Sequence, residues 1–258
     1  MTQVLYVVHG MRKGVYNDLL HNLISTMTEQ LPYAYRIAFL ESAETTPEDV
    51  VVNMLATSKD NIIVVPLLLF SARHYTHDVQ GLVQWIQQTY RSIYVHCTPP
   101  IALHTKVIAW LVRQIRHAQR RMLTETSMCK RAVVILTHGS PHTTLPDRQL
   151  QSIVEQCQDC FGTSLHVYAA SYYGALDYER RLKDLSQRYD ALDVIPLFLY
   201  DGFIVHKLKR QINDWALPCA ITMGHALNFD TCLHDILIDY IVNAEVTFDV
   251  SYTAQLVT

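Results

Sequence analysis

The sequence lacks the features that several common classes of protein need. Its 258 residues contain no long run of lysine and arginine, and a formal net charge of −3 offers no basic surface for nucleic acid. The longest apolar run, residues 62–70, is interrupted by Pro66 and is too short to cross a bilayer. The amino terminus has no basic and apolar leader. We therefore expect a cytoplasmic protein that binds neither nucleic acid nor membrane.

Motifs for nucleotide-dependent and serine-hydrolase chemistry are also missing. Neither a GxGxxG nor a Walker A arrangement occurs, and Thr-His-Gly-Ser at residues 137–140 is not the GxSxG of a nucleophile elbow. The six cysteines are scattered, which suits a reducing compartment better than a disulfide scaffold. Cys157 and Cys160 form a lone CxxC within a helical pattern, where coincidence is a simpler explanation than metal binding.

What the sequence does contain is an internal repeat. Residues 4–10, Val-Leu-Tyr-Val-Val-His-Gly, return as residues 133–139, Val-Val-Ile-Leu-Thr-His-Gly. Pro-Leu-Leu-Leu-Phe at 66–70 likewise corresponds to Pro-Leu-Phe-Leu-Tyr at 196–200. Each apolar run lacks polar alternation, which is typical of a parallel strand covered by helices on both faces. The chain therefore consists of two similar halves.

Strand and helix patterns alternate four times in the first half, which predicts a parallel sheet covered by helices. We expect two tandem α/β domains, residues 1–121 and 131–258, with a cleft between them. Each has a four-stranded, mainly parallel sheet flanked by helices, in a flavodoxin-like order with the first strand between the second and third. Residues 246–253 alternate with period two and predict an added strand in a C-terminal tail.

Three residues with metal-binding side chains follow the first three strands. His9 ends the first strand, Glu41 ends the second, and His74 lies a few residues after the third. Because the carboxyl ends of neighbouring parallel strands share one edge of a sheet, these side chains are expected to converge. The sequence thus predicts one site formed by two imidazoles and a carboxylate.

The second half keeps only part of this group. His138 retains the place of His9, whereas we align Ser171 with Glu41 and Ile204 with His74. A single functional site is therefore expected, in the first domain, with the second domain closing the cleft.

The motifs in these positions also resemble those of a known family. They are Val-Val-His-Gly at residues 7–10, Phe-Leu-Glu at 39–41 with Ala43 and Glu44, Pro-Leu-Leu-Leu-Phe at 66–70 followed by Ala-Arg-His at 72–74, and Asp-Gly-Phe-Ile-Val at 201–205. In this order, and with the repeat, they resemble the sirohydrochlorin chelatases of the class II chelatase superfamily. The resemblance implies a lyase that inserts a divalent metal ion into sirohydrochlorin, an anionic tetrapyrrole, with His9, Glu41 and His74 at the metal.

The metal ion is then a substrate, and no tightly bound cofactor is expected. We expect Fe(II), giving siroheme, because the sequence has neither the histidine-rich segment nor the cysteine-rich tail of some cobalt-inserting relatives. Co(II) insertion for cobalamin synthesis is the alternative within this class. Alternatives from other classes are a non-catalytic carrier of metal or tetrapyrrole and a metal-dependent hydrolase. The chain is expected to act as a monomer or a homodimer.

The three residues suit this chemistry. Imidazole and carboxylate bind Fe(II) or Co(II) without the tight hold of a thiolate, so His9 and His74 are expected as ligands and candidate bases and Glu41 as ligand or proton acceptor. For Asp78, four residues after His74, capping of a helix is the favoured interpretation and orientation of the imidazole is the alternative.

Basic residues near these positions are candidates for binding the substrate carboxylates. Arg12, Lys13 and Arg73 flank the ligand residues in sequence. His138 is a further candidate, either lining the cleft or capping a strand end.

Overall fold

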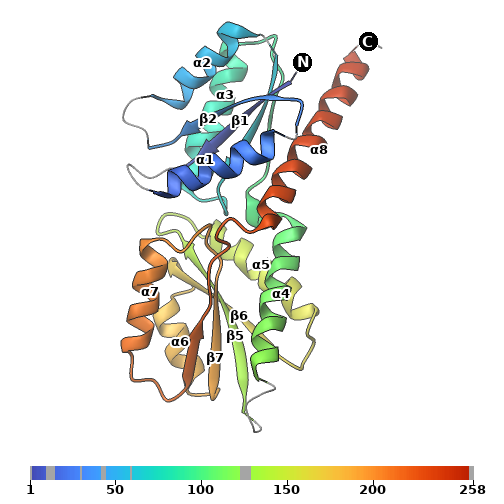
Figure 1. Cartoon of the computed structure of the whole chain (residues 1–258). Coiled ribbons are helices and arrows are strands. Elements are labelled where there is room, and N and C mark those ends of the chain that lie inside the picture. Colours follow the sequence, from blue (N-terminus) through green and yellow to red (C-terminus); the bar gives the residue numbers. More distant parts are fainter. Residues whose placement is uncertain are drawn as a thin grey trace. The chain divides into compact units, whose positions relative to one another are not determined.

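The computed structural model describes residues 2–9, 15–29, 31–41, 45–58, 60–122 and 129–255. The chain divides into two compact units. The first unit comprises Met1–His104 with Thr231–Thr258, and the second unit comprises Thr105–Asp230 (Figure 1).

The first unit contains a parallel sheet of four strands. These are β1 (Thr2–Val8), β2 (Ala34–Phe39), β3 (Asn61–Leu67) and β4 (Val95–Cys97), in the order β2-β1-β3-β4. The predicted α/β class and the position of the first strand between the second and third are therefore confirmed.

Helices cover both faces of this sheet, which explains why β1 is apolar without alternation. Leu5 and Val7 pack with α2 (Pro47–Thr57) and α3 (Gln80–Thr89). The opposite face is covered by α1 (Val15–Thr28) and α8 (Thr231–Gln255), which contact each other. Burying one such side chain contributes roughly 1.5–3 kcal/mol, so the central strand holds the unit together.

The second unit repeats this arrangement. Its parallel sheet has the order β6-β5-β7-β8, formed by β5 (Arg131–Gly139), β6 (His166–Tyr173), β7 (Ala191–Pro196) and β8 (Ala220–Met223). One face packs against α6 (Tyr178–Ser186) and α7 (Phe203–Asp214). The other face is covered by α4 (Thr105–Met122) and α5 (Leu145–Asp159), which contact each other (Figure 1).

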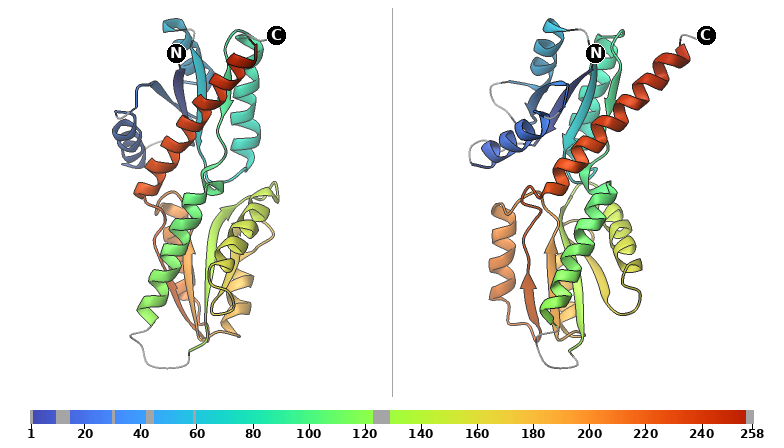
Figure 2. Two further views of the ribbon diagram at one scale, coloured as in Figure 1. Left: turned by 90° about the vertical axis from the view of Figure 1, so that its right-hand side faces the viewer. Right: turned by 45° about the vertical axis from the view of Figure 1, so that its right-hand side comes forward.

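The two units differ from the expected division at residues 1–121 and 131–258. Helix α4, which closes the first half of the sequence, packs on β7 of the second unit, and α8, which closes the second half, packs on β3 of the first unit (Figure 2). The two halves thus exchange their last helices. A repeated apolar pattern identifies the face that a helix buries, but not which of two similar sheets receives that face.

The predicted strand at residues 246–253 is wrong, because these residues belong to α8. Upstream in this helix, Ile236, Leu237 and Ile241 are fully buried. A helix that is already nucleated and packed gains one hydrogen bond for each residue it adds, so the short alternating run extends it instead of forming a strand. No helix among the described residues has both the length and the apolar character that crossing a bilayer requires.

Candidate metal centre

Three elements of the first unit bring His9, Glu41 and His74 to one edge of the sheet. His9 directly follows β1, and Glu41 follows β2, whose pairing with β1 extends to a hydrogen bond from the Leu40 N–H to the Val8 carbonyl of 2.9 Å. His74 begins η1 (His74–Val79), a π-helix between β3 and α3. The parallel direction of the strands explains why side chains from distant parts of the sequence meet here.

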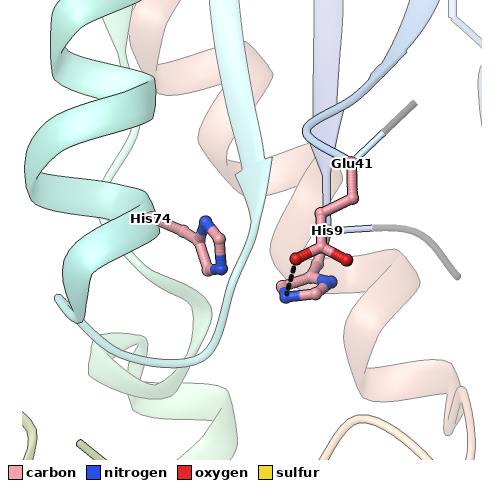
Figure 3. A group of neighbouring side chains, drawn as sticks. All are labelled: His9, Glu41 and His74. Carbon is pink, nitrogen blue, oxygen red and sulfur yellow. Dashed lines mark ion pairs between the residues drawn. The ribbon is translucent and has the colours of Figure 1, made fainter. Parts of the chain in front are cut away.

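The geometry of this group suits an open metal site. One ligand atom from each residue can be chosen so that all lie within 4.8 Å of one another. Nε2 of His9 lies 3.7 Å from Oε1 of Glu41, and the rings of His9 and His74 are 4.5 Å apart at 83° (Figure 3). Ligands about 2.1 Å from a tetrahedral ion lie about 3.4 Å from each other, so small side-chain rotations are enough to complete the set.

The three side chains remain accessible to solvent. The exposed fractions are 46% for His9, 44% for Glu41 and 36% for His74. With three protein ligands, an ion keeps positions for water or for a second ligand, as in catalytic and unlike closed structural sites. An ion held in this way is able to leave.

Asp78 orients His74. Nδ1 of His74 lies 2.7 Å from Oδ2 of Asp78, four residues later on η1. An ionised carboxylate only accepts hydrogen bonds, so Nδ1 of the neutral ring carries the proton and Nε2 keeps a lone pair that is available to a metal ion. Neither the start of η1 nor the start of α3 has a hydrogen bond from a capping side chain, so the favoured interpretation of Asp78 as a helix cap is wrong. A π-helical turn is uncommon and occurs often at functional sites.

The candidate residues for binding substrate carboxylates lie in different parts of the chain. Arg12 and Lys13 lie outside the described residues. Arg73 is exposed and directly precedes His74, whereas His138 is exposed at the end of β5 in the second unit.

The alignment of Ser171 with Glu41 is wrong. Val8 pairs with Phe39 in the first unit, and Thr137 pairs with Ser171 in the second, so Ser171 corresponds to Phe39 and is fully buried. The pairing of Gly139 with Tyr173 then makes Tyr173 the counterpart of Glu41. Across the residues that the structure describes, His9, Glu41 and His74 are the one group of three with metal-binding geometry.

The thiols belong to other environments. Burial raises the pKa of Cys97 to about 11. Burial, followed by the nearby Cys160, raises the pKa of Cys157 to about 12. Both thiols are therefore protonated at neutral pH, whereas metal binding requires the thiolate. The interpretation of the CxxC as helical spacing agrees with the position of Cys157 on the buried side of α5.

The chain is similar to known proteins over the segment that contains the candidate metal centre and beyond it. Residues 3–118, which contain His9, Glu41 and His74, match the family model CbiX. A sirohydrochlorin ferrochelatase of Priestia megaterium is 24% identical over 217 residues, covering 83% of this chain and 79% of the relative. A sirohydrochlorin cobaltochelatase of the same organism is 22% identical over 227 residues, covering 84% and 70%.

Two solved structures share the fold across both units. SirB from Bacillus subtilis with Fe3+ has a TM-score of 0.76 at 19% identity and covers 93% of this chain and 94% of its own. SirB from Bacillus subtilis subspecies spizizenii in complex with cobalt has a TM-score of 0.68 at 20% identity, with 93% of each chain covered. The chain is therefore similar to the CbiX and sirohydrochlorin chelatase proteins, and its two-unit fold is that of the SirB structures.

Proposed function

We propose that this protein is a sirohydrochlorin chelatase that inserts Fe(II) into the ring to form siroheme. The observation that carries the proposal is the group His9, Glu41 and His74, whose ligand atoms lie within 4.8 Å at an exposed sheet edge. This group lies in the segment that matches the CbiX model, and the two relatives described above are named as sirohydrochlorin chelatases.

The reaction replaces two ring protons by one metal ion. The metal-free ring carries two pyrrole N–H groups. The two N–H bonds break, their electron pairs stay on nitrogen, and two protons leave; the ion is then bound by these two nitrogens and by the lone pairs of the other two ring nitrogens. The protein therefore has to deliver the metal ion and accept two protons, and the oxidation state of the metal does not change.

The metal ligands suit delivery. Imidazole and carboxylate bind first-row divalent ions, and an incomplete set of protein ligands leaves positions that ring nitrogens occupy as the ion transfers. Because Asp78 holds Nδ1 of His74, Nε2 is the atom that this residue contributes. The ion passes from His9, Glu41 and His74 to the ring as these ligands dissociate.

The same residues suit proton acceptance. Nε2 of His9 and Oε1 of Glu41 are 3.7 Å apart, so a proton taken by either group can pass to the other or to water with a small movement. Both side chains are nearly half exposed, which gives that proton a path to solvent.

Fe(II) is the proposed metal and Co(II) is the alternative. The relatives named for iron and for cobalt are 24% and 22% identical to this chain, and nitrogen and oxygen ligands do not select one of these ions by themselves. The insertion rates with Fe(II) and Co(II) distinguish the two ions.

An anaerobic assay that follows the absorption of metal-free sirohydrochlorin tests the proposal. The native chain is mixed with an excess of ring and Fe(II), Co(II) or no metal. We expect many metallated rings per chain, formed faster with Fe(II) than with Co(II). Faster insertion of Co(II) would assign the protein to the cobalt branch, and a signal that stops near one ring per chain would identify a carrier.

A further inference from the structure

Three positions in the second unit correspond to His9, Glu41 and His74, but two of them carry side chains of another chemical type. His138 corresponds to His9, Tyr173 to Glu41 by strand register, and Ile204 to His74 by sequence. A carboxylate and an imidazole are thus replaced by a phenol ring and an aliphatic side chain. Only one of these three positions, His138, still has a metal-binding side chain, so they do not form a set of metal ligands. Two of the three side chains are aromatic rings.

Three rings lie together at this edge. The ring of His138 is 5.2 Å from that of Tyr173 at 67°, and Tyr172 is 4.6 Å from Tyr173 at 70°. Tyr173 is 43% exposed, whereas Tyr172 also contacts the largely buried Tyr178 at 5.6 Å. Tyr172 therefore supports the cluster from the core side, and Tyr173 offers its ring to solvent.

Two glycines fix the backbone around Tyr173. Gly139 has a φ of 65°, and a Cβ on it would lie 1.8 Å from the Tyr173 carbonyl oxygen. Gly174 has a φ of 113°, and the next N–H, that of Ala175, donates to the buried carboxylate of Asp147 at 2.7 Å. The close approach of β5 and β6 extends the sheet to Tyr173, so this exposed residue stands on a rigid strand and not on a loop.

A cation lies beside these rings. Nζ of Lys207, on α7, donates to the Tyr172 hydroxyl at 2.7 Å and lies 5.4 Å from the centre of its ring. This hydrogen bond raises the pKa of Lys207, so the side chain is an ammonium at neutral pH. Phe203, one turn earlier on the same helix, is 73% exposed.

We propose that these residues of the second unit, His138, Tyr172, Tyr173, Phe203 and Lys207, form a binding surface for the sirohydrochlorin ring. The exposed aromatic rings contact the flat macrocycle, and Lys207 pairs with a carboxylate on its rim. We name this set the Tyr173 patch. The inference rests on the proposed function, since it assigns the residues that hold the organic substrate of that reaction.

Equilibrium titration of the full chain with metal-free sirohydrochlorin, without any metal, tests the patch. We expect Tyr173→Ala to raise Kd about 10-fold by removing the exposed ring, and Tyr173→Phe to keep nearly native binding. Lys207→Met should raise Kd about 3-fold to 10-fold and reduce the dependence of Kd on salt. In the insertion assay both changes should raise KM for the ring but not KM for the metal.

Lys183 provides a matched control. Its Nζ lies 5.5 Å from the centre of the Trp215 ring, but it is in the last turn of α6 and so near the opposite edge of the sheet. Lys183→Met should leave Kd unchanged. Native Kd in both Tyr173→Ala and Lys207→Met, with their melting temperatures unchanged, would overturn the patch and leave the proposed function intact. Failure of the native chain to bind the ring would overturn both.

Discussion

Asp78 and His74 form a 2.7 Å contact between carboxylate and imidazole that leaves Nε2 as the nitrogen with which His74 would bind the proposed metal ion. The two residues lie four positions apart on η1, so the π-helical turn supplies both the proposed ligand and the carboxylate that orients its ring. A metal-bound imidazole is commonly held in this way by a carboxylate behind it.

We therefore predict that Asp78→Ala weakens metal use without removing a ligand. The Kd for Co(II), or KM for the metal during insertion, should rise about 10-fold to 100-fold, because the ring of His74 loses its fixed orientation and tautomer. Asp78→Asn should have a smaller effect, since its carbonyl oxygen still accepts from Nδ1. A helix-capping role would instead lower the melting temperature and leave the KM for metal unchanged.

Two glycines with similar backbone angles should differ strongly in their tolerance of alanine. Gly139 and Gly162 have φ values of 65° and 56°. A Cβ at Gly139 would lie 1.8 Å from the Tyr173 oxygen, whereas nothing lies within 4 Å of a Cβ at Gly162. Gly162→Ala should lower the free energy of unfolding by about 1 kcal/mol, because only the left-handed backbone opposes it. Gly139→Ala should lower it by more than about 3 kcal/mol, because the Cβ also collides with the Tyr173 carbonyl. Urea unfolding of both variants measures the difference, and equal midpoints would contradict it.

Acid should destabilise the second unit through Asp201. Burial alone would raise the pKa of this carboxyl, but hydrogen bonds from Asn228, His225 and the Ala226 N–H outweigh it and hold the pKa below its usual value. A lowered folded-state pKa stabilises the protein above the unfolded-state value of about 3.9, and this contribution disappears as pH falls through the folded-state pKa.

Asp201→Asn should therefore reduce the free energy of unfolding at pH 7. Below about pH 4 the free energy of unfolding of this variant should change less with pH than that of the native chain. Asp184→Asn, an exposed change on α6, is the control. Melting curves between pH 3 and 7 measure the effect, and parallel pH profiles for native chain and Asp201→Asn would contradict the prediction.

The exchange of α4 and α8 predicts which unit a core change disturbs. Ile236 on α8 and Ile115 on α4 are fully buried, so either change to alanine should cost about 2–5 kcal/mol. Ile236→Ala should speed amide exchange in β1 and β3, although it lies near the end of the chain, and Ile115→Ala should do so in β5 and β7. The reverse pattern would restore the division at residues 1–121 and 131–258.

The central features of both sheets were predictable because they depend on local patterns. An apolar run without alternation identified β1, and a polar residue directly after it identified His9. Thr46 and Pro47 are residue types that favour the start of a helix, and the structure shows a capping box between Thr46 and Asp49 at the start of α2. Each of these signals lies within a few neighbouring residues.

The remaining features depend on contacts that the pattern does not contain. Aligning Ser171 with Glu41 was an error of two residues in strand register, and such a shift keeps every side chain on the same face of the sheet, so the apolar pattern is unchanged. The role of Asp78 depends on a turn that is π-helical, and the destination of α8 depends on a choice between two similar sheets.

The most direct test of the account measures the initial rate of anaerobic metal insertion in the native chain and in His9→Ala, His74→Ala and Glu41→Gln. Matched controls are His117→Ala, on the exposed side of α4, and Glu48→Gln, exposed in the first turn of α2. We predict that each of the first three changes lowers the rate at least about 100-fold, while the controls stay within about 2-fold of native. Native rates in any two of the three site variants, with the fold intact, would contradict the assignment of this group as the metal centre.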